Sequence, residues 1–587
     1  MVDIPDIDDD SSIILTGHGI IQNLKEHGIQ YIFGIPDGHT LALYDGLKEI
    51  EGIEHILVND ERTAAFAADA YARVSNMLGV CDAGAAGSMN FPVALSEANG
   101  AGSPVLAVVG SVKSKDLLRN IPHDIKIAET LKPVTKWAEN VTHTENCPRF
   151  LNYAIREAVN GRPGSVALVF PEDVLADTKL KREDFIPMNE GSCSINGCSI
   201  APAQSEIDQC VRMIRNSKQP VIFAGGGTVR SGAYAEVRKF AELIQAPVIS
   251  TILGKGIMKD EPDYGNQYYG TVGLFGERPN HLFLKRKTDL VIAIGNRLTE
   301  DDTAQFKFPS QETPMIHIDI DAREIGLNYK ALGVIGDPKA ALSQIIHQIE
   351  EQGVTASGKE ELILEERTEN LNLLKKAHKK YRRRDNKKWM DAEPIKPQRV
   401  LKAIADNMEA EDYLVTDASS SSRWIGAYFP VKSLGRHIIT PRGVGPTGFG
   451  LGALIGTHFA LKQMHSADDM PRIVLFTGDG GLMNGGVSDF ETIVKNEINC
   501  TIVIINNSAL GFVKYGQGTL YKHRFYETDR LTSPFVEIAE AFGGNGITVE
   551  KIKDLDMEMQ RALNSKGFNL INVLTDPDEL LPKNYYV

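Results

Sequence analysis

Short apolar runs that alternate with amphipathic segments along almost the whole chain limit the fold more than any other feature. Runs such as "VLAVVG", "LVIAIG" and "CTIVII" are rich in β-branched residues and have the length of strands buried on both faces. The segments between them are amphipathic, as helices that cover a sheet are. This alternation is typical of parallel sheets covered by helices, so we predict an α/β fold.

The alternation is interrupted twice, which divides the 587 residues into three blocks. A Ser/Gly-containing stretch of low hydrophobicity follows residue 186, and a charged, helix-prone linker covers residues 351–394. We therefore predict three doubly wound parallel-sheet domains, at 1–186, 205–350 and 395–587, each of ordinary domain size.

The charge and cysteine content exclude several classes of partner. A formal charge of −14, part of it in the acidic and presumed solvated segment 1–10, argues against nucleic acid and anionic membranes. No apolar run reaches membrane-spanning length and the N-terminus is not basic, so we expect a cytoplasmic protein without membrane contact. Cys193 and Cys198 have no second cysteine pair nearby, so no metal site is predicted there.

Polar residues follow two consecutive apolar runs in the third block. "IVLF" leads to Gly478-Asp479-Gly480, and "CTIVII" leads to Asn506-Asn507. In a βαβ unit the carboxyl ends of both strands lie at the same edge of the sheet, where open α/β proteins bind ligands. Carboxylate and amide oxygens suit Mg2+, which shares its oxygen ligands with phosphate. A lone Gly-Asp-Gly is most often a turn, but the second polar strand end makes the pattern more specific.

This pattern, in the last of three α/β blocks, resembles the diphosphate-binding module of thiamine diphosphate enzymes. The similarity covers the chain in the order pyrimidine-binding, middle and diphosphate-binding domain, and the nearest branch includes acetolactate synthase, pyruvate oxidase and benzoylformate decarboxylase. It implies thiamine diphosphate and Mg2+ as cofactors. The resemblance assigns Asp479, the Asn507 side chain and the Ala509 backbone oxygen as metal ligands, completed by the diphosphate and a water.

Further residues of the third block match the diphosphate site. Gly478, Gly480 and Gly481 would let the backbone approach a phosphate at the start of a helix. In "TDASSSSRW", the resemblance makes Ser420 and Ser421 candidate hydroxyl donors to the diphosphate.

One carboxylate of the first block matches the family's catalytic glutamate. In "LVNDERTAAFAADAYARVSN", Glu61 follows a predicted strand and starts a strongly helical run. The resemblance implies that Glu61 exchanges a proton with N1′ of the cofactor pyrimidine and so prepares the thiazolium ring for proton loss. The alternative is an ordinary first-turn glutamate favoured by the helix dipole.

Three other positions depart from the acetolactate synthase pattern. In "RGVGPTGFG" the residue that props the cofactor into its bent conformation is Thr447, where family members usually carry Met, Leu or Ile. His39 in "GIPDGHT" and His123 in "RNIPHD" match pocket positions and could carry protons on substrate oxygens. The alternative for each is a loop histidine bonded to backbone. "CDAGAAGSMNF" has no histidine where benzoylformate decarboxylase keeps one, which disfavours a dedicated aromatic decarboxylase.

A second cofactor, FAD, is not favoured. The segment "YYGTVGLFGERPN" lacks the histidine that accompanies FAD in acetolactate synthase. Lys255 and Arg297 keep the family pattern, but both also fit the description of surface charges.

The resemblance implies a carbon–carbon bond-forming or bond-cleaving enzyme. A 2-oxo acid such as pyruvate would lose CO2 and the remaining fragment would join a second carbonyl compound, as in acetolactate synthase. The alternatives are a 2-oxo acid decarboxylase and a lyase for a 2-hydroxy ketone or hydroxyacyl-CoA. Two classes outside the family are a nicotinamide-dependent dehydrogenase, disfavoured because "AGGGTVRSG" lacks the dinucleotide fingerprint, and a non-catalytic cofactor-binding regulatory subunit.

The assembly also follows from the resemblance. In this family the pyrimidine-binding and diphosphate-binding domains of one active site come from different subunits. We therefore expect at least a homodimer, commonly built up to a homotetramer.

Overall fold

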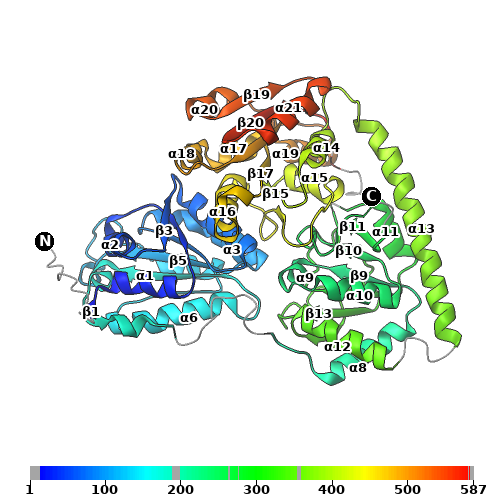
Figure 1. Ribbon diagram of the computed structural model, residues 1–587, viewed down its shortest axis with the longest axis horizontal. Helices are drawn as coiled ribbons and strands as arrows, with labels where there is room; N and C mark the ends of the chain where they lie inside the picture. The colour runs from blue at the N-terminus through cyan, green and yellow to red at the C-terminus, as the bar shows by residue number, and fades with distance from the viewer. Residues whose placement is uncertain are drawn as a thin grey trace. The chain divides into compact units, whose positions relative to one another are not determined.

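Three six-stranded parallel sheets form the framework of the protein (Figure 1). The computed structural model describes residues 13–187, 199–261, 265–274, 276–352, 358–579 and 581. The predicted solvated segment 1–10 and the pair Cys193 and Cys198 lie outside the described residues. The prediction of three doubly wound parallel sheets is confirmed.

The first sheet has the strand order β3-β2-β4-β5-β7-β6. Its strands are β2 Tyr31–Gly34, β3 Glu54–Leu57, β4 Gly79–Ala83, β5 Val105–Ser111, β6 Trp137–Asn140 and β7 Ser165–Pro171. The main helices around it are α1 Thr16–Glu26, α2 Leu41–Glu49, α3 Glu61–Ser75, α4 Phe91–Ala101 and α6 Cys147–Val159. A small antiparallel pair, β1 Ile13–Ile14 with β8 Leu180–Lys181, was not expected from the sequence.

The second sheet has the order β11-β10-β9-β12-β13-β14. Its strands are β9 Pro220–Ala224, β10 Val248–Ser250, β11 Tyr268–Thr271, β12 Leu290–Ile294, β13 Met315–Asp319 and β14 Leu332–Ile335. Its helices include α8 Gln204–Asn216, α9 Gly226–Arg230, α10 Tyr234–Ile244, α11 Arg278–Arg286 and α12 Pro338–Glu351. The charged linker forms the long helix α13, Gly358–Trp389, which contacts α11.

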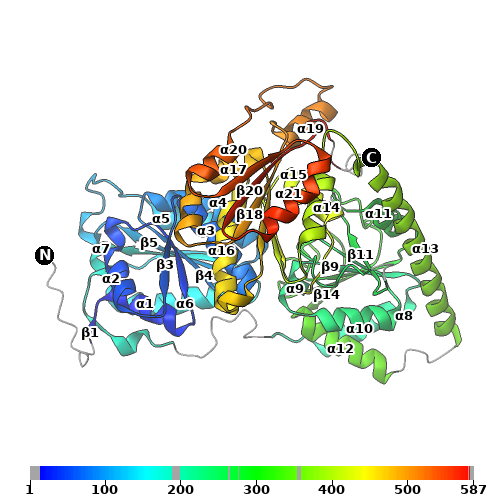
Figure 2. The ribbon, with the colours of Figure 1, turned by 45° about the horizontal axis from the view of Figure 1, so that its top comes forward.

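The third sheet has the order β16-β15-β17-β18-β20-β19. Its strands are β15 Tyr413–Thr416, β16 Ile438–Ile439, β17 Ile473–Gly478, β18 Cys500–Asn506, β19 Asn545–Val549 and β20 Phe568–Leu574. Its helices are α14 Pro397–Asn407, α15 Ser420–Tyr428, α17 Asp479–Gly485, α19 Gly511–Leu520, α20 Phe535–Ala541 and α21 Ile552–Asn564. The short helix α18 Phe490–Lys495 follows α17 in the chain but groups with the first sheet. Helices α20 and α21 pack beside β19 and β20 (Figure 2).

The compact units of the chain do not follow the order of the sequence. Residues Gly443–Met470, which contain α16 (Phe449–Met464), and Gly485–Ile498 form one unit with the first sheet, and the second and third sheets belong to the other unit. Helix α16 packs on α3 because two glycines remove the side chains between them. A Cβ added at Gly452 would lie 2.8 Å from the Phe66 Cβ, and one at Gly456 would overlap the Ala67 carbonyl oxygen.

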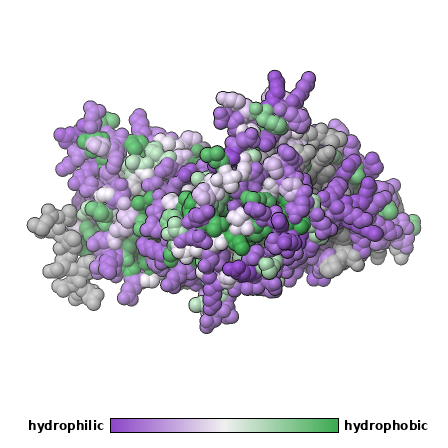
Figure 3. All heavy atoms as spheres, turned by 90° about the horizontal axis from the view of Figure 1, so that it is seen from above, coloured by the Kyte–Doolittle hydropathy of each residue, from purple (hydrophilic) through white to green (hydrophobic). Residues whose placement is uncertain are grey.

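On the face seen in Figure 3 the surface is mainly hydrophilic, with apolar residues in patches among the polar ones. Within the described residues, no helix combines the length and the apolar character needed to cross a bilayer. The buried apolar side chains instead lie between sheets and helices, which is the ordinary way that an α/β protein forms its core.

Candidate active site

The polar residues after β17 and β18 lie at one edge of the third sheet, as predicted. The two strands pair in parallel, and Gly478 stands opposite Ile505. This register brings the start of α17, with Asp479, and the end of β18, followed by Asn507, to the carboxyl edge where ligands bind in such sheets.

Asp479 is a buried carboxylate with an unused oxygen. Its exposed fraction is 4 %, and its Oδ2 accepts no hydrogen bond in the described structure. Burial raises the pKa of Asp479 to about 6, although the Gly480 N–H and the Arg530 guanidinium, whose Nε lies 3.8 Å from Oδ2, act in the opposite direction. A buried carboxylate oxygen without a partner is costly, and a divalent cation would satisfy it. These residues therefore fit a Mg2+ ion.

The two asparagines after β18 have different roles. Asn506 is buried and its amide binds Asn572 and Ser508, so it holds the sheet end together. The Asn507 Oδ1 accepts a hydrogen bond from the Ala509 N–H at 3.2 Å. Asn507 is the half-buried member of the pair and remains the one suited to a ligand.

Residues 528–530 pair with the loop at 508–510 and support this edge of the sheet. They bring Arg530, which sequence reasoning missed, to the site. The Leu510 N–H donates to the Thr528 carbonyl at 2.7 Å, and the Arg530 N–H donates to the Ser508 carbonyl at 2.8 Å. These bonds place Arg530 beside Asp479. Nothing in the local sequence marks Arg530, since the pairing of two loops creates the contact.

The three glycines of the motif have different surroundings. A Cβ at Gly478 would meet nothing within 4 Å, so the space beside it is open to a ligand. A Cβ at Gly480 would make an ordinary contact with Leu510 Cδ2 at 3.4 Å. A Cβ at Gly481 would lie 2.8 Å from Thr477 Oγ1 and 3.1 Å from the buried Asp417 Cγ. Protein packing therefore explains Gly481.

The two candidate serines lie at the start of α15. The Ser421 hydroxyl is buried and bonds to the Asp417 carbonyl at 3.0 Å and the Ala418 carbonyl at 2.6 Å. Its proton is therefore used inside this turn. Ser420 is half-buried and is the better candidate donor to a phosphate.

Glu61 is the first residue of α3, as predicted. Its Oε2 accepts a hydrogen bond from Asn90 Nδ2 at 2.9 Å, and a Cβ added at Gly87 would overlap its Oε1. Gly87 and Asn90 therefore hold the carboxylate in place. Both residues lie in the segment "CDAGAAGSMNF". The glycines and polar residues of this segment were a signal that sequence reasoning did not use.

A buried ionic network fixes the turn that carries Thr447. Glu97 is fully buried and accepts hydrogen bonds from Arg73 at 2.9 Å and from the N–H groups of residues 443–445 at 2.8, 2.8 and 2.9 Å. Arg73 also binds the buried Asp69. Burial opposes ionisation, but Arg73 and the three N–H groups lower the pKa of Glu97 below its ordinary value. Thr447 is exposed on this turn, just before α16.

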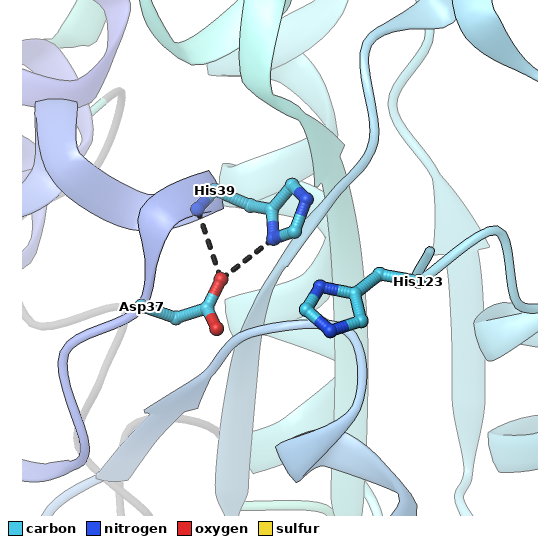
Figure 4. Close-up of side chains that lie close together, drawn as sticks. All are labelled: Asp37, His39 and His123. Atoms are coloured by element: carbon cyan, nitrogen blue, oxygen red, sulfur yellow. Dashed lines mark hydrogen bonds and ion pairs between the residues drawn. The ribbon is translucent and has the colours of Figure 1, made fainter. Parts of the chain in front are cut away.

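His39 and His123 come together around Asp37, a residue that sequence reasoning missed (Figure 4). Asp37 Oδ1 accepts hydrogen bonds from the His39 N–H at 2.9 Å and from its Nδ1 at 2.6 Å. The ring centroids of the two histidines are 5.1 Å apart. Burial opposes ionisation, but the His39 bonds and nearby His123 lower the pKa of Asp37. The alternative of a backbone-bonded loop histidine does not describe the His39 ring, because its Nδ1 binds a carboxylate.

Lys255 and Arg297 occupy different environments. Lys255 has an exposed fraction of 5 %, and its Nζ donates to the Gly426 carbonyl at 3.4 Å. Burial lowers the pKa of Lys255, which Asp260 and Glu277 partly offset. The surface-charge interpretation is therefore wrong for Lys255. Arg297 is partly exposed and its Nε lies 3.2 Å from Glu324.

Comparisons with known proteins agree with the three-domain arrangement. The models of the thiamine pyrophosphate enzyme N-terminal TPP binding domain, central domain and C-terminal TPP binding domain match residues 15–130, 207–345 and 417–573. A probable acetolactate synthase large subunit of Methanocaldococcus jannaschii is 31 % identical over 575 residues, which cover 96 % of this chain and 92 % of that protein. The acetolactate synthase large subunits of Buchnera aphidicola and Lactococcus lactis are 29 % and 27 % identical, over 93 % and 96 % of this chain and 91 % and 93 % of theirs. The chain thus belongs to the thiamine pyrophosphate enzymes and is an acetolactate synthase-like member of that family.

Proposed function

We propose that the chain decarboxylates a 2-oxo acid such as pyruvate and joins the remaining fragment to a second carbonyl compound, with thiamine diphosphate and Mg2+ as cofactors. Asp479 carries this proposal, because it places an unsatisfied buried carboxylate oxygen at the ligand-binding edge of the third sheet. The bound cofactor supplies the carbanion stabilisation that decarboxylation next to a carbonyl requires.

The third sheet supplies the groups that hold the cofactors. Asp479, the Asn507 side chain and the Ala509 backbone oxygen hold Mg2+, whose preference is for oxygen ligands. The Ser420 hydroxyl and the open backbone at Gly478 are suited to the diphosphate.

The first sheet supplies the proton-handling groups. Glu61 exchanges a proton with N1′ of the pyrimidine, while Asn90 holds its second carboxylate oxygen. When the His39 Nδ1–H donates to Asp37, its Nε2 is left as an acceptor, so His39 and nearby His123 move protons at substrate oxygens. Thr447 restricts the cofactor conformation through its stiff β-branched side chain.

A second candidate is simple decarboxylation of a 2-oxo acid, or the related lyase reactions. The histidine pair favours it, since an imidazolium can supply the proton that replaces CO2 in the product, whereas carboligation bonds that carbon to a second carbonyl compound. Product analysis separates the two, because carboligation from pyruvate yields acetolactate and decarboxylation yields acetaldehyde.

We propose that the protein assembles as at least a homodimer, commonly built up to a homotetramer. We propose the cytoplasm as its location. Support comes from the family resemblance, in which the active site uses domains of two subunits. Gel filtration with parallel assays tests it: we expect diluted monomer to be inactive, and a stable monomer with full turnover would refute it.

Glu61→Gln tests the proposed function directly. We expect CO2 release from pyruvate to fall more than about a hundredfold, in the range of general acid–base catalysis, while thiamine diphosphate still binds. Glu51→Gln, at an exposed loop position, is the matched control and should leave turnover unchanged. Full activity of Glu61→Gln would remove the catalytic assignment and favour a regulatory role. The visible spectrum of the purified protein tests for FAD, for which we expect no flavin absorption.

A further inference from the structure

The cluster of Asp37, His39 and His123 has the composition of a metal site. One possible ligand atom from each residue lies within 4.8 Å of those of the other two. We propose that this triad binds a divalent transition metal ion, with Zn2+ as the best-suited ion.

Hydrogen bonds within the triad do not use all of its possible metal-ligand atoms. Asp37 Oδ1 accepts hydrogen bonds from the His39 backbone N–H and from His39 Nδ1. Among the described residues, neither ring nitrogen of His123 takes part in a hydrogen bond. The His123 imidazole is therefore available to an ion, and an ion that binds His39 Nδ1 would take the place of the proton shared with Asp37.

The ligand types select the metal. Imidazole nitrogens favour Zn2+, Co2+, Ni2+ and Cu2+, whereas Mg2+ prefers sites made of oxygen atoms. Two imidazoles and one carboxylate make three protein ligands, the number found in zinc sites that keep a position open for water or another ligand. The triad therefore differs in chemistry from the oxygen-rich site at Asp479.

Two of the three ligands are held rigidly and the third lies on a separate loop. Asp37 is the N-cap of a short 3-10 helix, Gly38–Thr40, and an added Cβ at Gly84 would overlap its carboxylate. A Cβ at Gly110 would lie 2.9 Å from the His39 carbonyl, so strand β5 packs closely against this turn. His123 is exposed and has a left-handed φ of 71° (Figure 4). An ion can therefore reach His123 directly from solvent.

Metal binding at the triad should also change turnover, an expectation that rests on the proposed function. A ring nitrogen that binds a metal ion cannot accept a proton, so metal occupancy and proton transfer by the same histidines exclude each other. Zn2+ should therefore inhibit turnover in the presence of saturating Mg2+.

Binding is measured on the full-length protein after EDTA treatment and removal of any histidine tag, without thiamine diphosphate or substrate. Co2+ serves as the probe because its visible absorption reports its ligands, and Zn2+ titrated by calorimetry gives the affinity. With saturating Mg2+ present to occupy the Asp479 site, we expect one equivalent of Co2+ to bind per chain. Because His123 is exposed, His123→Gln should fold normally and weaken binding at least about tenfold.

Two further variants sharpen the test. His39→Gln should also weaken binding at least about tenfold, with circular dichroism as the check on its fold. His143→Gln removes an exposed histidine of the same unit that lies outside the triad, and it should bind as the unaltered protein does.

Absence of Co2+ binding, or equal binding by His123→Gln and His39→Gln, would overturn the metal site. Neither result touches the proposed function, because the assay contains no thiamine diphosphate. Conversely, a failure of Glu61→Gln to lose activity would leave this binding measurement intact.

Discussion

Two buried carboxylates, Glu97 beside the first sheet and Asp479 in the third, differ in their hydrogen bonding and in the direction of their pKa shifts. Glu97 receives hydrogen bonds from Arg73 and three backbone N–H groups, and these lower its pKa. Asp479 keeps an oxygen without a hydrogen bond, and burial raises its pKa to about 6. A fully satisfied buried charge is a structural element, whereas a buried carboxylate oxygen without a hydrogen bond at the ligand-binding edge of a sheet is suited to hold a cation.

The largest expected effect is the loss of stability in Glu97→Gln. The change leaves the buried Arg73 without one of its two carboxylates and weakens the bonds to residues 443–445. We expect the free energy of unfolding to fall by about 3–5 kcal/mol, as when a buried ion pair loses one partner. Urea denaturation measures it, and a loss within the error of the exposed control Glu51→Gln would contradict the structural role.

A buried histidine, His281, makes the stability of the protein depend on pH. His281 is 4 % exposed, and burial lowers its pKa to about 4, despite the hydrogen bond to the Gly273 carbonyl. The unfolded chain binds a proton near pH 6.5 and the folded chain does not, so stability is lost as pH falls from about 6.5 to 4.

This single group accounts for up to about 3 kcal/mol over that range. We expect His281→Gln to flatten the decline, as seen in denaturation curves at neutral and acidic pH. Parallel curves for the variant and the unaltered protein would show that His281 does not contribute.

Asp479→Asn should affect the third-sheet site without weakening the fold. An amide lacks the charge that holds Mg2+, so we expect cofactor-dependent turnover to fall at least about a hundredfold, or ~2.7 kcal/mol. In the absence of cofactors the thermal midpoint should stay level or rise, since an unsatisfied buried charge is removed. A large drop in stability would place Asp479 with Glu97 as a structural carboxylate.

The smallest expected effect is at an exposed ion pair. Lys402 and Asp406 lie one helical turn apart on α14, with Nζ and Oδ2 2.7 Å apart. Solvent and salt screen such pairs, so Lys402→Ala should change the free energy of unfolding by less than about 0.5 kcal/mol. A loss of stability as large as that of Glu97→Gln would mean that burial does not explain the difference between the Lys402–Asp406 pair and the Arg73–Glu97 pair.

Hydrophobic periodicity predicted the three sheets, the long linker helix and the strand ends that carry Asp479 and Asn507, because these depend on local pattern. The grouping of α16 with the first sheet could not be predicted, since it depends on close approach at Gly452 and Gly456. Arg530 was missed because its contact with Asp479 depends on the pairing of two loops.

The candidate residues beside the first sheet show the same limit of prediction from sequence. Glu61 and the two histidines were identified from the sequence by resemblance, but their partners Asn90 and Asp37 were not. A supporting residue is defined by the side chain it touches, and that contact exists only in the folded chain.

The central claim is that a divalent ion at Asp479 anchors thiamine diphosphate. Calorimetric titration of thiamine diphosphate into the EDTA-treated full-length protein, with and without added Mg2+, tests it most directly. We expect binding that requires Mg2+ and is lost in Asp479→Asn. Binding that is equally tight without a divalent ion, or no binding under either condition, would contradict it.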